Sequence, residues 1–167
     1  MEGTGRLIVM RHAKAGELPG GPDFERALRP RGRTDSAAAG AWLRAGGYRP
    51  DLVLCSSARR ARQTWQYVAE ALGTQARVQT EERLYEADAG ELAEILRETP
   101  AGVGTLMYVG HNPAAADLVA LLTGTETEFP TAAIAVIGAV GAWAELAPAQ
   151  HELLATWTPK GERPPEE

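Results

Sequence analysis

Cysteine is nearly absent from this chain of 167 residues, in which Cys55 stands alone. One cysteine cannot form an internal disulfide, and a chain of this length buries about 70% of its unfolded surface without such staples. No apolar run approaches the ~20 residues that cross a bilayer, and the first residues lack the cationic and apolar regions of a signal peptide. We therefore expect a soluble cytoplasmic protein with no membrane partner.

The spacings of common metal and nucleotide sites are also missing. The three histidines form no His-x-x-x-His pair, and there is no cysteine cluster, so we expect no bound metal. Gly3-x-Gly5 precedes the first predicted strand, whereas a dinucleotide fingerprint follows its strand, and no Gly-Lys-Ser/Thr of a P-loop is present. These absences disfavour the nucleotide-binding folds of those types.

Positive charge is scarce overall but unevenly placed. The formal net charge of -5 argues against general affinity for nucleic acid or an anionic membrane. Residues 1–77 nevertheless hold 13 of the 17 Lys and Arg, against 7 of the 22 Asp and Glu. An anion-binding face in the first half and an ordinary solvated charged surface are both compatible with this distribution.

Short apolar runs alternate with helical patterns along most of the chain. The runs predict strands at residues 7–10, 52–55, 76–80, 105–109, 133–140 and 153–157. Residues 16–32 have no apolar periodicity and predict a long loop. Such alternation implies a three-layer α/β/α sandwich with a mostly parallel central sheet, and the last two strands predict an antiparallel C-terminal edge. We expect a single domain over residues 1–159 and a mobile tail over residues 160–167.

Capping residues and periodicity predict four helices. The first starts at Thr34 or Asp35 and runs to about residue 45. The second is capped by Ser56 or Ser57 and stops at Gly73. The third covers residues 91–98, and the fourth runs to residue 124. In the first helix, the predicted core face consists of Ala38, Trp42 and Ala45. In the fourth helix, Asn112 is the predicted N-cap and Pro113 the predicted first-turn residue.

Polar side chains gather where three predicted strands end. They belong to Arg11-His12, to the segment of residues 56–60 and to the segment of residues 110–112. Ligands of open α/β sheets bind beyond the carboxyl ends of the strands, where such segments converge. We therefore expect these three segments to form one site.

The chemistry of these segments suits a phosphate. An Arg-His pair such as Arg11-His12, taken alone, is more often a surface salt-bridge partner beside a hydrogen-bonded histidine than part of an active site. Arg60 is more informative, because a cation in the first turn of a helix is mildly unfavourable unless an anion binds there. Capping explains the residues that follow His111 but not the imidazole itself. Arg60 and His111 thus favour an anion site.

In this order the motifs resemble those of the histidine phosphatase superfamily, also called phosphoglycerate mutase-like. They are LIVMRHAKA, LCSSARRARQT and VGHNP, and the match spans residues 7 to about 122. The later segments TAAIAVIGAV and LLATWTP resemble the closing strands of its small branch, the SixA-type phosphohistidine phosphatases. The resemblance implies a nucleophile at His12, a phosphate pocket of Arg11, Arg60 and His111, and no cofactor.

Two departures from the family pattern leave questions open. Ala13 and Lys14 follow Arg11-His12 in place of the usual glycine, and Lys14 either contacts an acidic substrate or is solvated. Larger family members use a carboxylate to protonate an alkoxide leaving group. Glu86 occupies the matching place and is the candidate acid, although an exposed carboxylate explains it almost equally well.

Chain length favours one substrate class. Only about twenty residues separate Gln63-Thr64 from Leu84, which leaves little room for a substrate cap. An open pocket suits a phosphorylated protein, so we expect dephosphorylation of protein phosphohistidine through a covalent phosphohistidine intermediate. The alternative is a small-molecule phosphomonoesterase that acts on sugar or nucleotide phosphates. A phosphate-binding module without catalysis is disfavoured, because binding alone requires no nucleophile. The oligomeric state stays open.

Overall fold

The structure is a computed structural model that describes residues 4–159. Its six-stranded sheet has the order β3-β2-β4-β1-β5-β6. The strands β1 to β4 pair in parallel, β5 is antiparallel to β1, and β6 is antiparallel to β5. The bounds are β1 Gly5–Arg11, β2 Leu52–Ser56, β3 Arg77–Glu81, β4 Thr105–Gly110, β5 Ile134–Val140 and β6 Glu152–Trp157.

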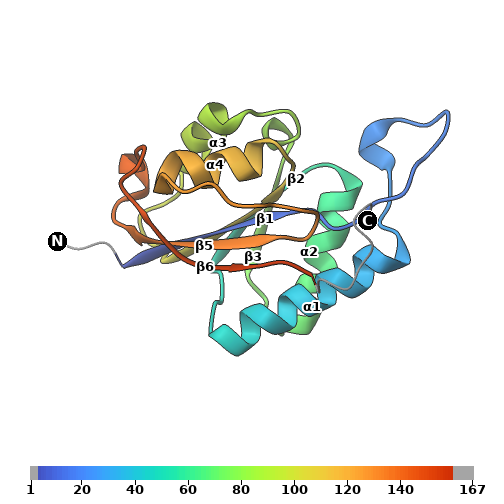
Figure 1. Cartoon of the computed structure of the whole chain (residues 1–167), viewed down its shortest axis with the longest axis horizontal. Helices are drawn as coiled ribbons and strands as arrows, with labels where there is room; N and C mark the ends of the chain where they lie inside the picture. The colour runs from blue at the N-terminus through green and yellow to red at the C-terminus, as the bar shows by residue number, and fades with distance from the viewer. Residues whose placement is uncertain (1–3, 160–167) are drawn as a thin grey trace.

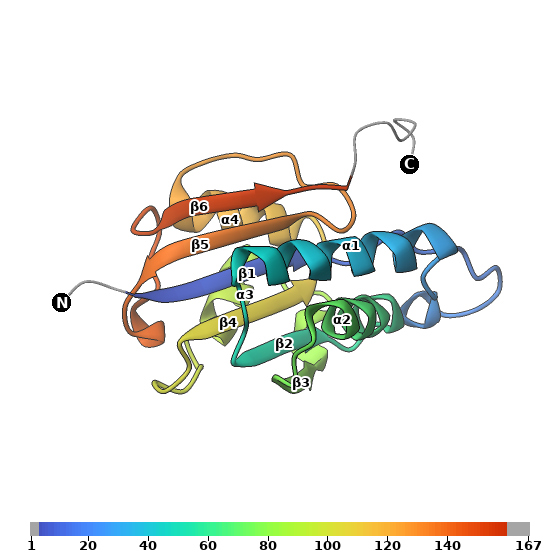
Figure 2. The same ribbon diagram turned by 90° about the horizontal axis from the view of Figure 1, so that it is seen from below.

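Helices cover both faces of this sheet. α1 (Pro30–Gly46) and α2 (Arg59–Leu72) lie on one face, and α3 (Ala89–Leu96) and α4 (Ala114–Thr123) lie on the other (Figures 1 and 2). Three short 3-10 turns, η1 (Asp23–Glu25), η2 (Glu82–Leu84) and η3 (Trp143–Glu145), lie between these elements. The predicted three-layer sandwich with an antiparallel C-terminal edge is confirmed.

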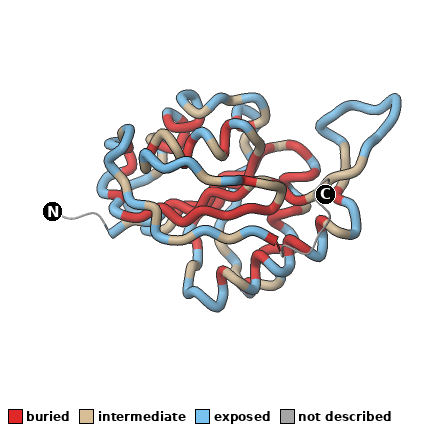
Figure 3. The backbone as a smooth tube through the Cα atoms, viewed as in Figure 1, coloured by how far each residue is buried: buried red, intermediate tan, exposed pale blue. Residues whose placement is uncertain are grey.

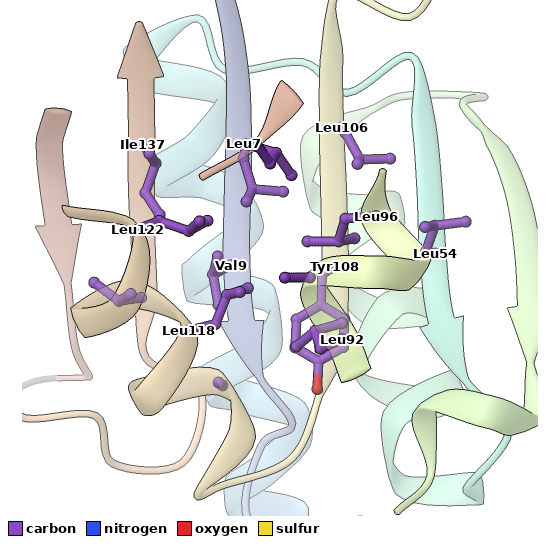
Figure 4. Packing of buried hydrophobic residues seen from close by; sticks show 14 of the residues in the cluster. Leu7, Val9, Leu54, Leu92, Leu96, Leu106, Tyr108, Leu118, Leu122 and Ile137 are labelled. Atoms are coloured by element: carbon purple, nitrogen blue, oxygen red, sulfur yellow. The ribbon is translucent and has the colours of Figure 1, made fainter. Parts of the chain in front are cut away.

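The core lies in two layers, one on each face of the sheet. Along β1, Leu7 and Val9 pack in the layer under α3 and α4, whereas Ile8 and Met10 pack in the layer under α1 and α2. All four are fully buried, and Figure 3 shows the buried backbone concentrated in the sheet. Figure 4 shows Val9 beside Tyr108 of β4, and Leu7 further along β1 at the level of Leu106. A strand covered on both faces needs a continuous apolar run, which is why β1 was recognisable from sequence.

α1 begins four residues before the predicted cap. Its first residue is Pro30, whose ring suits the first turn because that position needs no N–H donor. Thr34 and Asp35 lie inside the helix, and Asp35 is buried. The predicted N-cap of this helix was therefore wrong.

The predicted core face of α1 was also wrong. Ala38 and Ala45 are exposed. The buried face carries small residues instead, because α1 packs very closely on α2. A Cβ atom at Gly40 would lie only 2.4 Å from the carbonyl oxygen of Val68. Trp42 is half-buried beside Trp157, with ring centroids 6.4 Å apart.

The other helix starts differ from the predictions by one to three residues. Neither Ser56 nor Ser57 caps α2, since its N-cap is Ala58, and Ser56 ends β2. α3 begins at Ala89, because Asp88 forms a capping box with the third helical residue. In α4 the N-cap is Pro113, one residue after the predicted cap Asn112. The side-chain oxygen Oδ1 of Asn112 still accepts a hydrogen bond from the N–H of Ala116 at 3.2 Å.

Cys55 is buried in β2, and burial raises the pKa of its thiol to about 12. No helix within residues 4–159 is long and apolar enough to span a bilayer. The predicted mobile tail of residues 160–167 lies outside the described residues.

Candidate active site

The order of the sheet brings the three predicted segments together. β2, β4 and β1 are neighbouring parallel strands, so their carboxyl ends lie side by side. Arg11 is the last residue of β1, Ser56 the last of β2 and Gly110 the last of β4. Parallel strands that end together present the following side chains on one rim.

His12 is buried at this rim, with 8% of its surface exposed. Its Nδ1 lies 2.8 Å from the carbonyl oxygen of Ala13. A carbonyl only accepts, so Nδ1 carries the proton of the neutral ring and Nε2 keeps a free lone pair. Burial, followed by the nearby charges of His111, Arg60 and Arg11, lowers the pKa of His12 to about 3. The ring is therefore a neutral base at physiological pH.

Arg60 points at the free nitrogen of His12. It lies in the first turn of α2 and is 6% exposed, and its Nε donates to Nε2 of His12 across 3.3 Å. Thr64, one turn further along α2, connects Arg60 to Ala13, the residue that follows His12. Its hydroxyl donates to the carbonyl oxygen of Arg60 at 2.7 Å and accepts the N–H of Ala13 at 2.9 Å.

His111 comes to the same rim from the end of β4. Its ring meets that of His12 edge-on, with centroids 5.2 Å apart. Its Nε2 shares a hydrogen bond of 2.8 Å with the hydroxyl of Ser56, and its backbone N–H donates to the hydroxyl of Tyr108 at 3.1 Å. Burial, and then Arg60, lowers the pKa of His111 to about 4.

Arg11 reaches the same rim from the end of β1. Its Nη1 donates to the carbonyl oxygen of Phe129 at 3.2 Å, and the side-chain amide of Asn112 donates to the same oxygen at 2.8 Å. The Nε of Arg11 and the Nδ1 of His111 are buried and have no hydrogen-bond partner among residues 4–159. Buried donors without acceptors are costly, and the oxygens of an anion would satisfy them.

Asp23 was not predicted, yet it joins the site from η1. Its Oδ2 accepts from Nη2 of Arg60 at 3.1 Å and from the hydroxyl of Tyr85, and its Oδ1 accepts from Nε of Arg26 at 2.9 Å. Arg60 also donates through Nη1 to the backbone carbonyl of Asp23 at 3.0 Å. The hydrogen bond from Tyr85, helped by the two arginines, lowers the pKa of Asp23 to about 2.

The structure does not join Glu86 to these residues. Glu86 is exposed, and within residues 4–159 it has no hydrogen bond or ion pair to His12, Arg11, Arg60 or His111. It lines an acidic groove of about 520 Å³, which Tyr85 also borders. Among the described residues, no group of three or more His, Cys, Asp or Glu is placed to hold a metal ion.

Residues 7–108 match the model of the histidine phosphatase superfamily, branch 1. The chain belongs to the histidine phosphatase superfamily. An uncharacterized protein of Mycobacterium tuberculosis is 38% identical over 162 residues, which cover 90% of this chain and all of the relative. The match of the family model and the convergence of the three motifs on one rim make the chain a histidine phosphatase, as the sequence motifs predicted.

Solved structures place the chain near SixA within the superfamily. A structure assigned as the phosphohistidine phosphatase SixA of Nakamurella multipartitia has a TM-score of 0.84 and 32% identity, and the alignment covers 95% of this chain and 98% of that one. The protein histidine phosphatase SixA in complex with tungstate has a TM-score of 0.78 and 26% identity, with coverages of 90% and 95%. The predicted SixA-type branch is confirmed.

Proposed function

We propose that this protein removes phosphoryl groups from phosphohistidine on proteins, with His12 as the covalent nucleophile. The observation that carries the proposal is the arrangement of His12 and Arg60. The unprotonated Nε2 of a buried, neutral imidazole faces a guanidinium at 3.3 Å, so a phosphoryl group held by Arg60 would lie against the nucleophile.

The reaction follows from the roles of the surrounding donors. Nε2 of His12 attacks phosphorus in line, a P–N bond forms, and the bond to the leaving group breaks with its electron pair on the leaving atom. Arg11, Arg60 and His111 donate to the phosphoryl oxygens, where negative charge develops. Water then attacks the phosphorylated His12, the P–N bond breaks, and inorganic phosphate leaves. These steps require no metal or other cofactor.

The choice of a protein phosphohistidine rests on the leaving group. An imidazole departs more readily than an alkoxide and needs less help from an acid. Glu86, the candidate acid, is exposed, and within residues 4–159 it has no hydrogen bond to the four residues of the proposed phosphate site. The short connection from α2 to η2, which holds only β3, also leaves the rim without a covering domain. Sugar and nucleotide phosphates, the alternative substrates, have oxygen leaving groups that depend on such an acid.

The covalent intermediate gives a direct test. Brief incubation with labelled phosphoramidate, followed by rapid quenching in alkali, should leave an acid-labile label on the wild-type protein. His12→Ala should take up no label, whereas His151→Ala should retain it, because the ring of His151 hydrogen-bonds to Ala147 and Ala139, away from the rim. Label of equal strength on His12→Ala would rule out His12 as the nucleophile.

A substrate panel tests the second half of the proposal. It compares a phosphohistidine protein with glucose 6-phosphate and a nucleoside monophosphate at equal concentrations. We expect the phosphohistidine protein to have the highest kcat/KM. Faster turnover of either metabolite would replace the protein substrate with the small-molecule alternative while leaving the histidine mechanism intact.

A further inference from the structure

We propose that Asp23 is a specificity-determining residue that selects substrates with a nitrogen leaving group. The proposal rests on the phosphatase function proposed above and concerns its substrate class. Asp23 holds the phosphate-binding guanidinium in the free protein, and after displacement its carboxylate would face the atom that leaves phosphorus.

Every nitrogen of the Arg60 guanidinium is engaged in the free protein. Nε donates to His12, Nη1 to the carbonyl oxygen of Asp23 and Nη2 to its carboxylate. A phosphoryl dianion needs these donors, and two anions that share one guanidinium repel each other strongly in a partly buried site. Binding of the substrate at Arg60 therefore requires the carboxylate of Asp23 to move off Nη2.

Two other contacts keep the displaced carboxylate nearby. Arg26 and Tyr85 also donate to Asp23, and neither bond depends on Arg60. Arg26 is itself anchored to the carbonyl oxygen of Gly16 at 3.1 Å. The ring of Tyr85 meets His111 edge-on, with centroids 5.7 Å apart. Asp23 thus stays at the rim when it releases Arg60.

A groove of about 510 Å³, lined by residues next to and bonded to Asp23, offers room for the rest of the substrate. Phe24, the next residue, lines it and is 48% exposed. Tyr85 lines the same groove while it donates to Asp23. We place the leaving group in this groove, because Tyr85 lines it and also contacts the ring of His111 and the carboxylate of Asp23.

A carboxylate at that position distinguishes nitrogen from oxygen leaving groups. The protonated imidazole of a phosphohistidine, or the ammonium of phosphoramidate, carries N–H donors and a positive charge that the carboxylate stabilises. When the P–N bond breaks, its electron pair stays on nitrogen and the group departs as neutral imidazole or ammonia without any further proton. An oxygen leaving group gains negative charge in the same step, and the carboxylate opposes it.

The decisive measurement is the ratio of kcat/KM for phosphoramidate to kcat/KM for p-nitrophenyl phosphate. Asp23→Asn keeps the shape and removes the charge, and we expect the ratio to fall by about tenfold. Glu17→Gln is the matched control, because it removes one exposed carboxylate from the same loop and should leave the ratio unchanged. A ratio for Asp23→Asn within about twofold of the wild type would overturn the proposal.

A second measurement separates this proposal from the proposed function. Inorganic phosphate should bind Asp23→Asn more tightly than the wild type, as measured by calorimetry, because its internal competitor is gone. Equal affinity would overturn the displacement step even if neither protein turned over phosphoramidate. Asp23→Ala replaces Asp23→Asn if circular dichroism shows that the latter is unfolded, with the same expected changes.

Discussion

Arg60 donates a hydrogen bond from Nε to Nε2 of His12 across 3.3 Å. The same guanidinium holds Asp23 through its other two nitrogens. One side chain therefore contacts both the proposed nucleophile, His12, and the carboxylate of Asp23. Its planar fork suits these simultaneous contacts.

Replacement of Arg60 by lysine should remove most activity while keeping the charge. A lysine ammonium cannot make the forked contacts of a guanidinium, so we expect kcat/KM for phosphoramidate to fall by about 10²- to 10³-fold. Arg59→Lys, at the exposed neighbouring position, should be close to wild type. A variant Arg60→Lys with full activity would show that bidentate binding is not needed.

Thr64→Val should disturb the site through the backbone. The substitution preserves shape but removes the acceptor of the Ala13 N–H, and a buried donor left unpaired costs about 1–3 kcal/mol. We expect a lower free energy of unfolding in urea and a lower kcat at temperatures where the variant is fully folded. Thr64→Ser, which restores the hydroxyl, should recover both. Failure of serine to recover kcat would contradict a positioning role for the hydroxyl.

Acid should destabilise the protein through His12. Its folded pKa of about 3 is below its unfolded value, so the unfolded chain binds the extra proton. The stabilisation is complete above the unfolded pKa of about 6.5 and is lost as pH falls toward the folded pKa, which amounts to about 2 kcal/mol between pH 7 and pH 5. Urea unfolding at the two pH values should show this loss for the wild type, and a smaller loss for His12→Asn. Equal losses would mean that His12 is not held neutral.

Glu86→Gln separates the two enzyme hypotheses. If the protein is a phosphohistidine phosphatase, activity on phosphoramidate should be unchanged, because the leaving nitrogen departs as a neutral molecule. Activity on an alkyl phosphate should then be low both before and after the substitution. Strong wild-type turnover of an alkyl phosphate that Glu86→Gln abolishes would identify Glu86 as the acid and favour a phosphomonoesterase.

The strands were predictable because their physical cause is local. β1, β2 and β4 are covered on both faces, so each carries an uninterrupted apolar run, and their ends place Arg11, Arg60 and His111 by topology alone. The start of α1 also had a signal in the sequence, namely a proline suited to a first turn. The prediction instead placed the start of the helix at Thr34 or Asp35, because both are common capping residues.

Asp23 had no such local signal. It lies in a loop without apolar periodicity, and its partners Arg60 and Tyr85 are 37 and 62 positions away along the chain. Its role at the rim depends on tertiary contacts that spacing does not encode. The contact of Thr64 was unpredictable for a similar reason. Thr64 belongs to the matched motif, but its partner Ala13 follows the end of a different strand.

The burial of Cys55 affects the sensitivity of this enzyme to oxidants. Peroxide inactivates phosphatases whose nucleophile is a thiolate, since the thiolate is the form that reacts. In the mechanism proposed above the nucleophilic atom is an imidazole nitrogen, and the pKa of about 12 leaves the one cysteine of the chain almost entirely as an inert thiol inside β2. Phosphate hydrolysis by this site should therefore persist during oxidative stress that silences cysteine-dependent phosphatases.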